Sequence, residues 1–424
     1  MKKLHPEKGK QYLIIGNSAA GIAAAREIRR RDPKGRITIV SDERSFGYSR
    51  VMLPLYIAGK IGKKEMVIAK RDDYSRLGIN LLRGDPVESI DPKGQRVVTR
   101  KGIHFPYDQL LVATGSSPRT LKIPGSDLPG VHYLRKIDDA DGIRKDLSSS
   151  PAPVLVVGGG LVSVKTLEAL IHKKRKVYMV ISSNRILSQM LDETASDLFL
   201  EALRKKEISV HLQTDVLAFE GNERVEGVRL SDGTFLLCSM AIIGKGVKPN
   251  VGLLEGTGIR LNEGVVVDER MATNLSSIYA AGDVAETIDL LKKKHQGQAI
   301  WPLAVEGGRV AGTNMASVST FLPGGMRMNV VELLGIKAVS VGAEEGVDLL
   351  THLSPGNPLY RKLVFSGGRL TGFLLVGDIH CAGVLTSLVK NGTPVSTSAL
   401  EEGLERGFSF SPKLRSLAGQ VRFS

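Results

Sequence analysis

The fold of the first part of the chain is decided by the stretch Tyr12-Leu13-Ile14-Ile15-Gly16-Asn17-Ser18-Ala19-Ala20-Gly21. It holds a short apolar run and a glycine-bounded turn, and it opens an Ala-rich segment with helical spacing to Arg30. A second apolar run, residues 37–40, ends just before Asp42 and Glu43. This order of strand, tight turn, helix, strand and acid predicts the βαβ unit that binds dinucleotides.

Each small residue of the turn has an expected task. Gly16 lets the chain turn sharply, and Gly21 lets the helix pack closely on the strand. The free N–H groups at the helix start, around Ala19 and Ala20, can hold a pyrophosphate. Ser18 replaces the usual middle glycine and slightly crowds that ligand. An ordinary βαβ unit without a ligand remains the alternative.

A second fingerprint follows the apolar run at residues 154–157. The turn is Gly158-Gly159-Gly160, the predicted helix continues to His172, and a strand is expected at residues 176–181. Ser163 stands where the third glycine is usual, and Ile181 stands where an acid would bind a ribose 2′-hydroxyl. The scaffold therefore indicates a nucleotide site whose specificity determinants are weak. Arg185 lies some way further along for a 2′-phosphate.

Three shorter motifs lie outside the two fingerprints. The loop Tyr48-Ser49-Arg50 is followed by Leu53-Pro54 and a short helix, while residues 60–76 indicate a surface helix. Ala113-Thr114-Gly115 ends a buried strand, and Ala281-Gly282-Asp283 ends another. A buried aspartate needs partners. Hydroxyls of a sugar-like chain or a helix N-terminus would satisfy Asp283.

Composition narrows the class of protein. The 424 residues are enough for two or three domains, and 42% hydrophobic with 24% charged residues is typical of a globular chain. No apolar run approaches the roughly 20 residues of a membrane span. No signal core follows the basic leader, so we expect a cytoplasmic protein. The cysteines Cys238 and Cys381 lack CxxC spacing, which argues against zinc, an iron–sulfur cluster and disulfides.

The net charge of +14 is concentrated at the start of the chain. Residues 1–125 hold 25 Lys and Arg against 12 Asp and Glu. This surface is either simply solvated or a docking face for an acidic partner, since such fields speed association. A nucleic-acid partner is disfavoured, because the chain has one Trp and no recognised reader motif.

Five motifs carry a family resemblance. In chain order they are the first fingerprint, the 48–54 loop, the Ala-Thr-Gly turn, the second fingerprint and the Ala-Gly-Asp strand end. The chain resembles the FAD/NAD-dependent pyridine nucleotide-disulfide oxidoreductase superfamily. The branch with rubredoxin and ferredoxin reductases and the nitrite reductase flavoprotein is the most similar.

The resemblance implies an α/β fold with two Rossmann-like three-layer nucleotide-binding domains, one inserted in the other, and a C-terminal α+β domain. An FAD domain would comprise residues 1–125 and 250–325, an inserted NAD(H) domain residues 126–249, and an interface domain residues 326–424. The β-rich pattern from about Met326 independently favours that last boundary.

The resemblance also implies the cofactor contacts. FAD would lie along Gly16, Ser18, Ala19, Ala20, Gly21, Asp42, Glu43, Arg50, Pro54, Ala113, Thr114, Gly115, Gly282 and Asp283. The co-substrate NAD(H) or NADP(H) would lie along Gly158, Gly160, Leu161, Val162, Ser163 and Gly246. No metal is expected.

Two departures from the family pattern bear on the chemistry. Disulfide-reducing relatives carry a redox cysteine in the loop that is residues 48–54 here, and this loop has none. Lys165 occupies a position where relatives often place a glutamate facing the flavin. We hypothesise that its amine favours reduced flavin by Coulomb attraction. The alternative is a solvent-facing lysine on an ordinary helix.

The sequence therefore predicts an FAD-dependent oxidoreductase that transfers a hydride from NAD(P)H to flavin. Electrons would pass to an acidic carrier such as rubredoxin or ferredoxin, or to a partner subunit, and the chain could form a homodimer. The alternative is an FAD-binding electron-relay or assembly subunit of a redox complex with a degenerate NAD site. An NADH oxidase is a weaker possibility.

Overall fold

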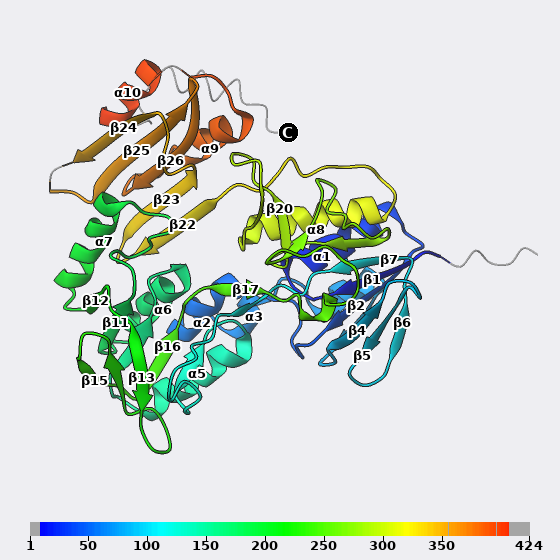
Figure 1. Ribbon diagram of the computed structural model, residues 1–424, viewed down its shortest axis with the longest axis horizontal. Helices are drawn as coiled ribbons and strands as arrows, with labels where there is room; N and C mark the ends of the chain where they lie inside the picture. The colour runs from blue at the N-terminus through cyan, green and yellow to red at the C-terminus, as the bar shows by residue number, and fades with distance from the viewer. Residues whose placement is uncertain (1–8, 355, 396, 407–424) are drawn as a thin grey trace, which may run out of the picture. The chain divides into compact units, whose positions relative to one another are not determined.

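Two compact units make up the computed structural model, which describes residues 9–354, 356–395 and 397–406 (Figure 1). The first unit contains the chain up to Met52, Gly62–Ser117 and Val247–Gly325. The second contains Leu53–Ile61, Pro118–Gly246 and the chain from Met326 onward. Each unit is assembled from distant segments of the sequence.

The first unit is built on a five-stranded parallel sheet with the order β19–β7–β1–β2–β3. Its strands are β1 (Gln11–Ile15), β2 (Arg36–Ser41), β3 (Ile79–Arg83), β7 (Gln109–Val112) and β19 (Ile278–Ala280). Its helices are α1 (Ala19–Arg31), η1 (Arg50–Met52), α3 (Lys63–Met66), α4 (Arg71–Arg76), η2 (Gly252–Leu254) and α8 (Trp301–Met315). Smaller sheets contain β4 (Val87–Asp91), β5 (Arg96–Thr99), β6 (His104–Pro106), β8 (Ser116–Pro118), β17 (Val247–Pro249), β18 (Val265–Val266), β20 (Ala285–Ile288) and β21 (His295–Gly297).

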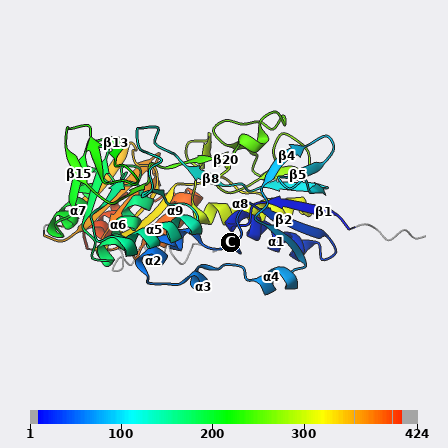
Figure 2. The same ribbon diagram turned by 90° about the horizontal axis from the view of Figure 1, so that it is seen from below.

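The parallel sheet is covered on both faces. Figure 2 shows α1 on one side of it and the antiparallel sheet β4–β5–β6 on the other. One continuous core joins the three layers, from Ile28 of α1 through Ile14 of β1 to Val97 of β5, all fully buried. Strands buried on both faces read as unbroken apolar runs, which explains the run at the start of the quoted stretch.

Helices α1 and α8 pack side by side with almost no space between their backbones (Figure 1). A methyl group added to Gly308 would lie 2.2 Å from the carbonyl oxygen of Ala20. At Gly312 it would lie 2.5 Å from the oxygen of Ala24. Only glycine allows this approach, and the close packing holds the fingerprint helix in place from a segment almost 300 residues away.

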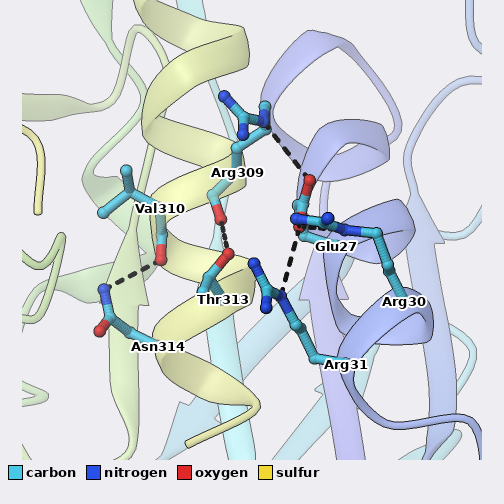
Figure 3. A network of polar contacts seen from close by, with 7 residues as sticks. All are labelled: Glu27, Arg30, Arg31, Arg309, Val310, Thr313 and Asn314. Carbon is cyan, nitrogen blue, oxygen red and sulfur yellow. Dashed lines mark hydrogen bonds and ion pairs between the residues drawn. The ribbon is translucent and has the colours of Figure 1, made fainter. Parts of the chain in front are cut away.

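A polar cluster at the end of this helix pair adds a second connection (Figure 3). Glu27 of α1 accepts hydrogen bonds from Arg30 at 2.7 Å and from Arg309 of α8 at 3.4 Å, and Arg31 lies 3.9 Å away. Burial alone would raise the pKa of Glu27, but Arg30 and Arg309 outweigh burial and lower it. The carboxylate therefore stays charged between several guanidinium groups.

The second unit contains another five-stranded parallel sheet with the order β12–β11–β10–β16–β9. Its strands are β9 (Val131–Tyr133), β10 (Val154–Val157), β11 (Val177–Ile181), β12 (Ser209–Leu212) and β16 (Met240–Ile243). Its helices are α2 (Leu53–Ala58), α5 (Ile137–Ser149), α6 (Leu161–His172) and α7 (Glu193–Lys205). An antiparallel sheet of β13 (Val216–Glu220), β14 (Gly227–Leu230) and β15 (Phe235–Leu237) packs on it through a shared core with Leu155 and Val180.

A five-stranded antiparallel sheet completes the second unit, with the order β22–β23–β26–β25–β24. Its strands are β22 (Met328–Leu333), β23 (Ile336–Gly342), β24 (Asp348–Ser354), β25 (Leu359–Ser366) and β26 (Arg369–Val376). Helices α9 (Ala382–Asn391) and α10 (Thr397–Arg406) pack against it. This part is the β-rich C-terminal region that the sequence indicates.

The predicted fold class is confirmed: two parallel sheets are flanked by helices, and an antiparallel sheet with helices follows. The domain boundaries after residues 125, 249 and 325 stay predictions. One local expectation is wrong. Residues 60–76 form the two short helices α3 and α4 instead of one surface helix, because Met66, Ala69 and Tyr74 turn inward into the core.

Two kinds of feature are absent from the described residues, namely a membrane-spanning helix and a cluster of metal ligands. None of the helices in residues 9–354, 356–395 and 397–406 is long and apolar enough to cross a membrane. Within the same residues, no group of three or more His, Cys, Asp and Glu side chains could hold a metal ion.

We predict that Gly308→Ala destabilises the protein by about 1–3 kcal/mol, because the added methyl group meets a backbone carbonyl that cannot move aside. Gly383→Ala in α9 is the matched control, since its methyl group would meet nothing within 4 Å. Helix propensity alone would make that control neutral or slightly stabilising, by up to about 1 kcal/mol. Thermal unfolding followed by circular dichroism measures both. Equal stability of the two variants would contradict the proposed role of the α1–α8 contact.

Candidate functional site

The first fingerprint has no room for side chains at two of its positions. Gly16 has φ +120°, and a Cβ there would lie 2.1 Å from the carbonyl oxygen of Ala113. A Cβ on Gly21 would lie 2.0 Å from the oxygen of Gly16. The turn is therefore held against the end of β7 on one side and the helix on the other. Both glycines have the steric reason that the sequence analysis assigns to them.

The start of α1 is suited to an anion. Ser18 is the N-cap residue and makes no side-chain cap hydrogen bond, so the first N–H groups of the helix, around Ala19 and Ala20, remain for a ligand. The neighbouring Asn17 accepts a hydrogen bond of 2.7 Å from the hydroxyl of Tyr74, which fixes the turn. These features fit the pyrophosphate of FAD.

The two acidic residues after β2, Asp42 and Glu43, lie in different environments. Glu43 accepts hydrogen bonds from the hydroxyl of Tyr48 at 2.7 Å and from Arg50 at 2.5 Å, whereas Asp42 is exposed. Burial acts to lower the pKa of Arg50, but the charge of Glu43 outweighs it and raises the pKa. The carboxylate of Glu43 therefore anchors the 48–50 loop. The ribose contact predicted for Asp42 or Glu43 stays a prediction.

The other residues of the first unit that the sequence predicts as FAD contacts gather at the carboxyl edge of its sheet. Thr114 donates to the carbonyl oxygen of Asn250 at 3.0 Å, and the Asn250 side chain donates back to the Thr114 carbonyl at 2.9 Å. A Cβ on Gly282 would lie 3.2 Å from the Cβ of Ala20 in α1. The ends of β7 and β19 thus stand beside the fingerprint, as expected for ligands of open α/β sheets.

Asp283 has a partner that the sequence analysis did not anticipate. Its carboxylate accepts a hydrogen bond of 2.8 Å from the hydroxyl of Ser116. A sugar-like chain would add further hydroxyl partners. Of the predicted FAD contacts, Pro54 differs from the rest, since it lies in α2 of the second unit, where α2 packs on α5 and α6.

The second fingerprint repeats the geometry of the first. Gly158 has φ +107°, and a Cβ there would lie 2.4 Å from the carbonyl oxygen of Gly244. Ser163 is 2% exposed, and its hydroxyl donates weakly to the oxygens of Val157 at 3.4 Å and Gly244 at 3.3 Å. A Cβ on Gly244 would lie 2.2 Å from the Ser163 hydroxyl oxygen. The serine therefore fits only because residue 244 is glycine.

The space in front of α6 is open. A Cβ on Gly160, the N-cap residue of α6, would meet nothing within 4 Å, and the same holds for Gly246. Leu161 and Val162 form the first turn, and Val162 is 44% exposed. This open space beside uncapped N–H groups fits the phosphates of a dinucleotide.

The end of β11 contains a polar cluster that sequence reasoning missed. The hydroxyl of Ser182 donates to Asp215 at 2.6 Å, and the Lys245 amine contacts both Ser182 and Asp215, the latter at 3.1 Å. The signal for Lys245 was its place directly after the apolar run of β16. Arg185, considered above for a 2′-phosphate, instead donates to the carbonyl oxygens of Leu191 and Ser188.

The Lys165 side chain is partly exposed, and its amine has two partners. Its amine contacts the carboxylate of Glu168 and donates to the carbonyl oxygen of Glu332 in β22 at 2.8 Å. The charge of Glu168 offsets the positive charge that flavin tuning would require. That role of Lys165 stays a prediction.

The two cysteines are poor nucleophiles. Burial raises the pKa of the Cys238 thiol to about 12, and burial with the charge of Asp378 raises that of Cys381 to about 12. Both thiols are protonated near neutral pH, so neither supports thiolate chemistry.

Comparisons with known proteins agree with this geometry. Residues 10–308 match the family model described as pyridine nucleotide-disulphide oxidoreductase. The chain is 30% identical to the NADH-dependent phenylglyoxylate dehydrogenase subunit epsilon of Aromatoleum evansii, over 91% of this chain and 93% of that protein.

Two further similarities extend the comparison. The chain is 28% identical to the nitrite reductase [NAD(P)H] of Bacillus subtilis (strain 168), over 92% of this chain but only 48% of that enzyme, so it spans about half the length of that relative. The crystal structure of the covalent putidaredoxin reductase–putidaredoxin complex superposes with a TM-score of 0.88 at 24% identity, over 98% of this chain and 99% of the matched chain. At that identity the structural likeness shows the fold.

We predict that Gly244→Ala weakens NADH binding roughly tenfold, because its methyl group collides with Ser163 and displaces the start of α6. Ser163→Gly removes the hydroxyl from the collision, so the double variant is expected to recover most of the affinity. Isothermal titration of the four proteins of this cycle measures the coupling. If the double variant binds NADH as weakly as Gly244→Ala does, Ser163→Gly does not compensate for the added methyl group.

Proposed function

This chain belongs to the pyridine nucleotide-disulphide oxidoreductase family and is an oxidoreductase, and we propose that it exchanges a hydride between NAD(P)H and FAD and electrons with another protein. FAD supplies the conversion between hydride and single-electron chemistry. The chain's own part is to bind both nucleotides, orient them and exclude water.

One observation carries this proposal over that of a relay subunit with a degenerate NAD site. Ser163, the apparent defect in the second fingerprint, is accommodated by Gly244, and the space at Gly160 is open. Both nucleotide sites therefore retain the close backbone packing and the free helix start that phosphate binding requires.

Several residues support the binding of FAD. The first turn of α1 would receive the pyrophosphate, and Asp283 would accept hydrogen bonds from the ribityl hydroxyls. The Arg50–Glu43 pair would hold the loop that borders the flavin. Sulfur chemistry on a cysteine of this chain has no support, since that loop contains none.

We further propose that the electron partner is acidic. The last turn of α1 presents Arg30 and Arg31, whose side chains are 58% and 36% exposed, and Arg309 beside them is 55% exposed. One carboxylate, that of Glu27, faces these three guanidinium groups (Figure 3). The remaining positive charge would steer an acidic surface toward the first unit.

Two kinds of partner match the relatives. The Aromatoleum protein is a subunit of a dehydrogenase, and the similar crystal structure is that of a reductase in covalent complex with putidaredoxin. A partner subunit and a free carrier are both proposed as electron partners on that basis. Self-association into a homodimer is proposed from the exposed apolar side chains of the C-terminal sheet, Val330, Leu349 and Leu353.

The relay subunit stays as a second candidate because of two observations in the second unit. Ile181 offers no carboxylate to a ribose, and Lys165 replaces the glutamate that relatives often have. Under this candidate FAD would bind but neither dinucleotide would reduce it.

We predict that the purified protein is yellow and that anaerobic addition of NADH or NADPH bleaches its flavin absorption at about one equivalent per flavin. Dithionite serves as the control that reduces bound flavin without a nucleotide site. Bleaching by dithionite alone would favour the relay subunit, and a colourless protein unable to bind FAD would reject both candidates.

We predict that the double change Arg30→Gln and Arg31→Gln lowers kcat/KM for an acidic plant-type ferredoxin roughly tenfold at low ionic strength, and that high salt removes the difference. Arg204→Gln with Lys205→Gln is the matched control, because it removes two exposed charges from the last turn of α7. Reduction of the flavin by NADH should be unchanged in both. An equal effect of the two double variants would contradict docking at α1.

A further inference from the structure

The adenosine end of the second nucleotide site lacks its usual anchor. In dinucleotide-binding units, an acid at the end of the second strand accepts a hydrogen bond from the ribose 2′-hydroxyl. Here that strand, β11, ends in Ile181, which is 2% exposed. A Cβ on Gly159 in the fingerprint turn would lie 2.9 Å from the Ile181 side chain. An apolar side chain therefore fills the place of the acid.

A carboxylate reaches the same strand end from the neighbouring strand. Asp215 follows β12, which pairs in parallel with β11, and its Oδ1 accepts a hydrogen bond of 2.6 Å from Ser182, the first residue after β11. The Lys245 amine lies 3.1 Å from the same oxygen. Asp215 thus stands one strand away from the usual position of the acid and next to the residue that follows Ile181.

The cluster lies at the edge of the sheet that holds the fingerprint. Lys245 follows β16, which pairs with β10 on the side opposite to β11. Its contact with Ser182 therefore spans the carboxyl end of β10, where Gly158 begins the turn. Ligands of parallel α/β sheets bind outside this edge.

The charge state of the cluster favours a hydroxyl over a phosphate. Hydrogen bonds from Ser182 and Lys245 lower the pKa of Asp215, so this carboxylate is ionised near neutral pH. Ser182 and Lys245 both contact Oδ1, and the Asp215 side chain is 60% exposed, so Oδ2 is available to a ligand. The ammonium of Lys245 is already paired with it, and Arg185 is engaged by backbone oxygens.

We propose that Asp215, held by Ser182 and Lys245, replaces the missing acid of β11 and selects NADH over NADPH. Its free oxygen accepts the hydrogen bond of the ribose 2′-hydroxyl. A 2′-phosphate would instead lie beside the Asp215 carboxylate, and the Lys245 ammonium is already paired with that carboxylate. This inference rests on the proposed function, since it names the nucleotide that the same site takes.

The test compares nucleotide affinities of the FAD-loaded protein. Dissociation constants for NADH and NADPH are measured anaerobically by isothermal titration after dithionite has reduced the flavin, so that no hydride is transferred. The three proteins are the unchanged protein, Asp215→Asn and the control Asp232→Asn. Asp232 is another partly exposed acid of the second unit, so the control makes the same change in charge. Competition with 5′-AMP and adenosine 2′,5′-bisphosphate isolates the adenosine end from the nicotinamide.

The unchanged protein is expected to bind NADH at least tenfold more tightly than NADPH, a difference of about 1.4 kcal/mol or more, because the 2′-phosphate and the Asp215 carboxylate carry like charges. Asp215→Asn removes the repulsion and frees Lys245 for the phosphate. We expect it to shift the ratio of the two dissociation constants at least tenfold toward NADPH, with the same shift for the two adenosine fragments. Asp232→Asn should leave the ratio unchanged.

Two results would overturn the inference while leaving the proposed function intact. One is a preference of the unchanged protein for NADPH, which would make Lys245 the determinant. The other is a nucleotide ratio that Asp215→Asn does not move. Binding of neither dinucleotide to the unchanged protein would instead reject the proposed function itself, and the inference with it.

Discussion

The contact on which both halves of this molecule depend is that of a glycine backbone against a carbonyl group. Gly16 turns against the oxygen of Ala113 after β7, and Gly158 turns against that of Gly244 after β16. In each case the glycine N–H donates a hydrogen bond of 2.8 Å to a carbonyl oxygen of the strand on the other side. Gly16 donates to Val40, and Gly158 donates to Val180. The central strand thus ends between two neighbours, and the helix that follows must begin at the same edge.

The sequence predicts this arrangement well where local pattern and tertiary environment agree. Both βαβ units are as expected, and the C-terminal region is β-rich as its pattern indicates. That pattern does not mark strand β24, because four of its seven residues, Asp348, Leu349, Thr351 and Leu353, are exposed. Edge strands obtain their pairing from a neighbour, and a single-chain pattern does not contain that neighbour.

The candidate site likewise contains features that the sequence predicts and features that it does not. Motif spacing located the fingerprints, the Ala-Thr-Gly turn and the Ala-Gly-Asp strand end, which the fold gathers at two sheet edges. It did not locate Asp215 or Lys245, because their partner Ser182 is 33 and 63 residues away and no short motif joins them. The sequence interpretation of Lys165 was either a flavin neighbour or a solvent-facing lysine, and neither included the contacts that its amine makes with Glu168 and the carbonyl oxygen of Glu332. The sequence alone does not show which side chains of distant segments contact one another.

The Ser163–Gly244 contact also makes the two positions dependent on each other. A methyl group at residue 244 would lie 2.2 Å from the serine hydroxyl oxygen, so the hydroxyl would have to turn away from the carbonyl oxygens of Val157 and Gly244. With glycine at residue 163 the same methyl group would lose that close contact. The effect of a substitution at 244 therefore depends on which residue occupies 163, and any redesign of this turn must choose the two residues together.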